Sequence, residues 1–305
     1  MNFGEDGKVL YECLTAGCPY VIMIINHVRV NGENELKKRT SAADAALAAL
    51  EKRESKYLDK RIRTAIPPHH RLLDEKLPPK LKDTLRGAFL HAFEAVFSGG
   101  GIIDRTIPRQ KHTTTYEIRR YTAELQPTKR SFRAFTDDAK KIRCANTFFS
   151  GSVGTAMGLF GIGLPDIPVF VGFVLRTIRE TALTNGFDCN TSGEQYFMLL
   201  LIEAALARGE NARACENTVN AWITAHRAIP AAAQKPSVLA DQLQRTAFAL
   251  SDAVIYDKFI QGIPIVGAAG GISDAVCVSQ IGTYAAYKYE RRRLMTPKNE
   301  SEDHV

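Results

Sequence analysis

The segment from Gly151 to Glu180 constrains the fold more than any other part of the chain. It is glycine-rich and apolar, and Pro165 and Pro168 interrupt it near its centre. Proline lacks a backbone donor and clashes with the preceding turn, so it ends a helix or occupies its first turn. The pattern predicts two helices joined by a sharp break, with Asp166 as N-cap of the second and Gly186 as the C′ residue after it.

Glycines recur at helical spacing in this segment and again near the C-terminus. At about 100° per residue those of the first helix share one face, which allows a second backbone to approach closely. Each glycine costs about 1 kcal/mol relative to alanine in a helix, so tight packing or membrane contact is expected to compensate. The candidate packing or membrane-contact residues are Gly151, Gly154, Gly158, Gly161, Gly267 and Gly271.

The remaining periodicity is also helical. Apolar residues favour helices over 35–66, 80–97, 236–259 and 264–293, with another from about residue 137, and Thr191-x-x-Glu194 predicts a capping box. No helix is predicted over the polar stretch 113–136, and no strand alternation is convincing after residue 35. The fold class is therefore all-α: a compact multi-helix domain with glycine-rich, proline-broken central helical hairpins.

This pattern divides the chain into four parts. We expect an N-terminal extension of uncertain role over 1–35 and a charged surface helix over 36–66, whose apolar stripe is thin. A helical domain is expected over 70–295 and a disordered tail over 296–305. The stretches 151–175 and 262–287 are weakly polar, but Asp166 and Asp274 interrupt them, which favours buried core helices over membrane spans.

The positive charge is unevenly distributed. The chain has 40 Lys and Arg against 33 Asp and Glu, and residues 1–141 hold 26 of the basic and 18 of the acidic residues. Such an excess favours polyanionic surfaces. Nucleic acid is disfavoured as a partner because basic residues are not interleaved with aromatics. An anionic membrane surface remains, and the expected lipid contacts at the end of the last predicted helix are Lys288, Arg291, Arg292 and Arg293.

Metal, cofactor and disulfide motifs are absent from the sequence. The six cysteines contain no CxxC pair, and Asp188-x-Asn190 begins like a calcium loop but has Leu199 at the position that needs a bidentate glutamate. Glu5 and Asp6 stand where a secretory signal would be basic. We therefore predict free thiols, no metal, no cofactor and a cytoplasmic location, with attachment to the inner face of the membrane.

One polar cluster is a candidate site. Arg176 and Glu180 lie one turn apart on an apolar helix that Asp166 begins. A ligand-binding cluster of these three residues is one interpretation, and an N-cap plus a structural ion pair is the favoured one.

Several of these residues resemble the conserved centre of the EcsC family. The resemblance lies in Asp166-x-Pro168, Arg176-x-x-x-Glu180-x-Ala182 and Ile263-Pro264-x-x-Gly267-x-x-x-Gly271, and it extends over about 75–295. Asp274 departs from the expected asparagine. The family is named after the third gene of an operon that encodes an ABC transporter. The resemblance thus implies an accessory role near a membrane, with a transporter complex as a partner, and no known activity.

Three functional hypotheses follow. The first is a non-enzymatic accessory protein at the inner face of a membrane. The second is a hydrolase that uses Asp166 and Glu180 as paired carboxylates, with Arg176 binding an anion. The third is a carrier of an apolar ligand, whose cavity the glycine stripe would line.

Overall fold

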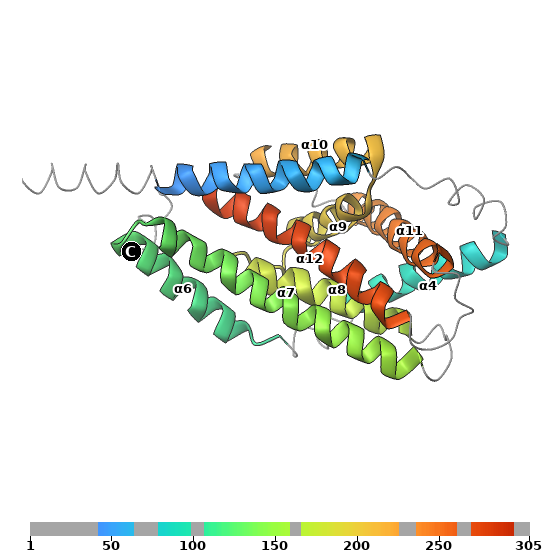
Figure 1. Cartoon of the computed structure of the whole chain (residues 1–305). Coiled ribbons are helices and arrows are strands. Elements are labelled where there is room, and N and C mark those ends of the chain that lie inside the picture. The colour runs from blue at the N-terminus through green and yellow to red at the C-terminus, as the bar shows by residue number, and fades with distance from the viewer. Residues whose placement is uncertain are drawn as a thin grey trace, which may run out of the picture.

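The computed structural model describes residues 42–63, 79–98, 107–158, 166–225, 236–260 and 270–295 (Figure 1). Every regular element in these ranges is an α-helix, which confirms the all-α class. The first described helix spans 42–63. The others are α4 (Pro79–Ser98), α6 (Arg109–Leu125), α7 (Lys129–Gly158), α8 (Asp166–Leu183), α9 (Ser192–Leu206), α10 (Gly209–Ala225), α11 (Pro236–Ile260) and α12 (Gly270–Met295).

Some of the predictions concern residues that the structure does not describe. The expected extension over 1–35, the expected tail over 296–305, Gly161 and Gly267 all lie outside the described residues. Among the described helices, none combines the length and apolar content that crossing a membrane requires.

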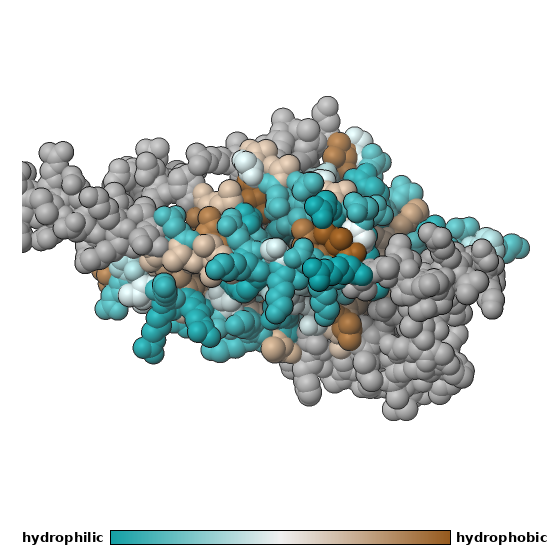
Figure 2. All heavy atoms as spheres, turned by 45° about the horizontal axis from the view of Figure 1, so that its top comes forward, coloured by the Kyte–Doolittle hydropathy of each residue, from teal (hydrophilic) through white to brown (hydrophobic). Residues whose placement is uncertain are grey.

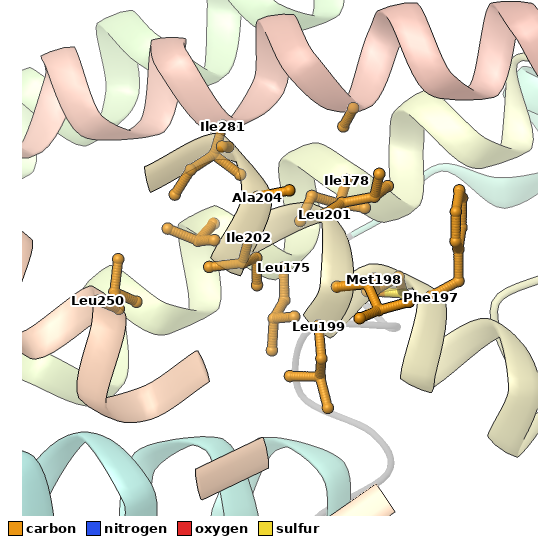
Figure 3. Packing of buried hydrophobic residues seen from close by; sticks show 14 of the residues in the cluster. Leu175, Ile178, Phe197, Met198, Leu199, Leu201, Ile202, Ala204, Leu250 and Ile281 are labelled. Carbon is orange, nitrogen blue, oxygen red and sulfur yellow. The ribbon is translucent and has the colours of Figure 1, made fainter. Parts of the chain in front are cut away.

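Helix α9 is the centre of the hydrophobic core. Ten of its fifteen residues are buried, and it packs against α10, α11 and α12. Figure 3 shows Leu175 and Ile178 of α8, Leu250 of α11 and Ile281 of α12 gathered around it. A helix that is apolar on all sides can be stable only when other helices surround it, so α9 determines where the rest of the bundle packs.

Helix α12 organises the other half of the bundle. It runs diagonally through the middle of Figure 1, between helix 42–63 and α7, and contacts α7, α8 and α9. The helices approach closely at Gly282, where a Cβ atom would lie 2.8 Å from Thr177 Cγ2 and 3.3 Å from Arg143 Cγ. A glycine at this position lets α12 approach α7 and α8 closely.

The predicted boundaries of α8 and α9 agree with the structure to within one residue, with Asp166 as the first residue of α8 rather than its N-cap. Helix α8 begins at Asp166 and ends before Gly186, which has a φ of +85°. The Phe187 N–H donates to the Ala182 carbonyl at 3.0 Å, the 6→1 bond of a Schellman motif. The Thr191 hydroxyl caps α9 by accepting from the Glu194 N–H at 3.2 Å.

Helix α6 was missed by the sequence analysis. It occupies much of the stretch 113–136 for which no helix was predicted, and α7 begins at Lys129 rather than near residue 137. Its buried residues are few, chiefly His112 and Ala123, whereas Ile118, Tyr121 and Leu125 are exposed. The helix has few apolar residues among many charged residues and threonines, so its apolar stripe is too weak for the prediction to detect.

Helix 42–63 is more deeply integrated than a charged surface helix. Its outer face is exposed, but Leu50, Glu54 and Arg61 are buried. Arg61 Nε donates to the Ala207 carbonyl at 3.0 Å, which attaches the helix to the loop between α9 and α10. The helix therefore packs on the same core as the segments after residue 70.

Candidate functional site

The predicted Arg176–Glu180 pair exists and is part of a larger polar cluster. Glu180 is 4% exposed and accepts hydrogen bonds from Arg176 Nε at 3.0 Å and from Asn146 Nδ2 at 2.6 Å. His112 Nε2 of α6 lies 3.9 Å from the same carboxylate. Burial raises the pKa of Glu180, but His112, Asn146 and Arg176 outweigh it, so the pKa lies below its ordinary value.

Asp166 cannot join this cluster. It is the first residue of α8, fourteen positions before Glu180 on the same helix. At 1.5 Å of rise per residue the two backbone positions are about 21 Å apart, far beyond the reach of two carboxylate side chains. The predicted three-residue site is wrong in this respect, because the two acids share a helix but lie several turns apart.

The geometry of the Glu180 cluster indicates a structural role. Its carboxylate joins α6, α7 and α8, and the hydrogen bonds of both its oxygens are satisfied within the protein. A carboxylate with a lowered pKa is a weak general base, and Asp166 lies too far away to act as its partner acid. The proposed hydrolase thus loses the carboxylate pair on which it depended.

The cations predicted to contact lipid are instead buried in ion pairs. Lys288 is fully buried, with its Nζ 3.0 Å from Glu54 Oε1 and 2.9 Å from Asn220 Oδ1, and it also forms an ion pair with Glu216. Arg291 Nε donates to Glu54 Oε2 at 2.9 Å. These two cations connect α12 to helix 42–63 and α10, so they do not present charge to a membrane.

The next two arginines are enclosed in the same way. Arg292 pairs with the buried Glu194, and its guanidinium lies 4.1 Å from the centre of the Phe187 ring. Arg293 lies 4.0 Å from the centre of the Phe135 ring, and burial lowers its pKa to about 10. The expectation that these basic residues face lipid was wrong, because acidic and aromatic partners from distant helices surround them.

The predicted glycine positions are only partly described. Gly151, Gly154 and Gly158 form the last turns of α7, and Gly271 lies in the first turn of α12. Their role in close packing or membrane contact stays a prediction.

Chemistry based on metals or disulfides receives no support from the described residues. In these residues no three His, Cys, Asp or Glu side chains are placed so that they could hold a metal ion. The cysteines in the same residues, Cys144, Cys189, Cys215 and Cys277, are free thiols.

Among the described residues, the hairpin of α6 and α7 is a strongly basic surface feature that the sequence analysis missed. Residues 109–146 contain ten basic and four acidic residues, a net charge of +6 within a chain whose net charge is +7. Lys129, Arg130 and Arg133 are exposed just after the turn. Counting charge over a window of about forty residues, rather than over half the chain, would have found this concentration.

The same hairpin carries the most exposed large apolar side chains of the described residues. Ile118, Tyr121 and Leu125 are 58%, 63% and 62% exposed. Their spacing of three and four residues places them on one face of α6. Figure 2, which brings the top of Figure 1 forward, shows one face of the molecule, on which hydrophilic residues alternate with hydrophobic areas.

Comparison with known proteins identifies the family. The model of the EcsC protein family matches residues 42–294. The chain belongs to this family. It is similar to Protein EcsC of Bacillus subtilis (strain 168), with 22% identity over 223 residues that cover 73% of this chain and 83% of that protein. No solved structure matches it. The match begins at residue 42, so the family domain includes helix 42–63, in agreement with its buried ion pairs.

Proposed function

We propose that this EcsC-family chain is a membrane-peripheral accessory protein that acts without catalysis at the cytoplasmic face of a membrane. The α6–α7 hairpin is its contact with anionic lipid. The observation that carries the proposal is the coincidence, on one hairpin, of most of the net charge with an exposed apolar stripe. Proteins that rest on anionic bilayers combine these two features.

The two features are next to each other at the turn. Leu125 ends α6 and Lys129 begins α7, with Arg130 in the same first turn and Arg133 in the next. Tyrosine suits the bilayer interface because its ring is apolar and its hydroxyl remains hydrated. Tyr121 and Leu125 can therefore enter the headgroup region while the cations pair with lipid phosphates.

The attraction is large enough to measure. A basic residue close to an anionic membrane contributes about 1 kcal/mol, so three contribute about 3 kcal/mol, which is roughly a 100-fold change in partitioning. The attraction extends over a Debye length of about 10 Å at 0.1 M salt and weakens as salt rises.

Vesicle co-sedimentation of the triple variant Lys129→Gln/Arg130→Gln/Arg133→Gln tests the proposal. The wild-type chain should sediment with anionic vesicles at low salt and much less at 0.5 M NaCl. It should not sediment with neutral vesicles. The triple variant should bind roughly 100-fold more weakly.

A matched variant controls for net charge. Lys56, Arg63 and Arg213 are exposed and lie on helix 42–63 and α10. Changing these three to glutamine removes the same charge but should lower binding by less than about threefold. Equal losses in the two triple variants, or no vesicle binding by the wild type, would refute contact through the hairpin.

A further inference from the structure

A groove of about 330 Å³ lies between helix 42–63 and the first part of α7. One end has an apolar lining of Ala45, Ala46, Ala49 and Phe132, and Lys129 and Arg133 line the groove beside Phe132. At the other end, Arg53, Thr136 and Lys140 also line a smaller cavity of about 90 Å³. The groove therefore combines an apolar lining at one end with cationic side chains along its whole length.

The polar end has more positive than negative charge. Arg53 Nη2 lies 2.9 Å from Glu290 Oε1, and the Thr136 hydroxyl donates to the same oxygen at 3.0 Å. Arg143 lines the small cavity beside Lys140. Glu290 thus balances Arg53, whereas Lys140 and Arg143 add positive charge that an anion can neutralise.

The exposed acid nearby does not cancel this charge. Asp137 lies 3.5 Å from Lys140 Nζ and 3.9 Å from Arg133 Nε, and all three side chains are at least 47% exposed, so water screens the two ion pairs. Breaking one of these weak ion pairs to bind a ligand phosphate therefore costs little free energy. Lys129 and Arg133 line the groove at the start of α7, whose N-terminal end is itself electropositive.

We propose that this groove binds one anionic amphiphile, with a phosphate or carboxylate head at Lys140 and Arg143. Its short apolar chains lie along Ala45, Ala49 and Phe132. The volume is at the lower end of that of small-molecule sites, which suits a lipid with short chains. This site goes beyond contact with a membrane surface, since it can take its ligand from a bilayer or from solution.

Calorimetric titration with monomeric short-chain lipids, in the absence of vesicles, tests the site. Dihexanoyl phosphatidate should bind, whereas dihexanoyl phosphatidylcholine and inorganic phosphate should bind at least tenfold more weakly. The first comparison tests the head and the second tests the chain.

Two pairs of variants locate the binding. Ala49→Trp fills the apolar end and should weaken phosphatidate binding at least tenfold, whereas Ala48→Trp, on an exposed residue outside the groove lining, should not change it. Lys140→Gln should weaken binding severalfold, and Lys141→Gln, also exposed and outside the lining, should not. Circular dichroism confirms that each variant is folded.

The outcomes separate this proposal from membrane contact. If the Ala49→Trp variant still sediments with anionic vesicles but no longer binds dihexanoyl phosphatidate, the groove is a separate site, as proposed. If the wild type sediments with vesicles but binds no monomeric phosphatidate, the groove proposal is wrong and the hairpin contact stands. Equal binding of inorganic phosphate and phosphatidate would also overturn it, because the apolar end would then contribute nothing.

Discussion

Replacing Lys288 by methionine should destabilise the fold strongly, because it leaves buried acids without their cation. Glu54 keeps Arg291 as a partner, with Arg291 Nε 2.9 Å from its carboxylate. The hydrogen bonds that Glu216 keeps within the described residues come from neutral groups, the Tyr284 hydroxyl at 2.7 Å and Asn220 Nδ2 at 3.0 Å. Removing one partner of a buried ion pair costs about 3–5 kcal/mol, so we expect a loss of this size.

Urea unfolding at pH 7, followed by circular dichroism, measures this loss. The second variant, Lys288→Met/Glu216→Gln, removes the uncompensated charge and should recover to within about 2 kcal/mol of wild type. A loss below about 1 kcal/mol for Lys288→Met would refute the argument. So would a double variant no more stable than the single one, since the cost would then not arise from the buried carboxylate.

Three further predictions concern stability. Glu180→Gln should lower the free energy of unfolding by about 1–3 kcal/mol at pH 7. Because the pKa of Glu180 is lowered in the folded state, the difference in melting temperature between this variant and the wild type should shrink as pH falls below the usual range of glutamate. A difference that stays constant with pH would contradict this. Gly186→Ala should cost more than Gly209→Ala in urea unfolding, since both have positive φ but only at Gly186 would a Cβ meet Tyr116, at 2.4 Å. Gly282→Ala should destabilise the fold, because its Cβ would meet Thr177 and Arg143. Gly87→Ala has open space around it and should raise stability by up to about 1 kcal/mol. Equal effects of the two substitutions would refute the close packing of α12 at Gly282.

The parts of the fold that depend on local chemistry could be predicted from sequence. Asp166 with Pro168 indicates where α8 begins, and Gly186 indicates where it ends, because capping involves only residues within one turn. Thr191 likewise indicates the start of α9. Glu194, however, does not complete the expected capping box, since its carboxylate pairs with Arg292 from α12.

The candidate sites were harder to predict, because they depend on partners far apart in sequence. Lys288 meets Glu54 across 234 positions, and Arg292 meets Glu194 across 98 positions. A run of basic residues at a helix end has the same local pattern whether it is buried or exposed. The α6–α7 hairpin was overlooked for the opposite reason, since its apolar residues face solvent and so do not mark a core.

Depth-dependent quenching of a tryptophan at the hairpin turn tests the central proposal most directly. The chain has one tryptophan, Trp222, which is 7% exposed, so a Leu125→Trp variant adds a second, exposed fluorophore. Its added fluorescence should shift to the blue and be quenched by brominated lipids in anionic vesicles, while Ala221→Trp, at an exposed position on α10, should show neither change. Binding of the Leu125→Trp variant to vesicles without quenching, or equal quenching of the two variants, would contradict attachment through the α6–α7 hairpin.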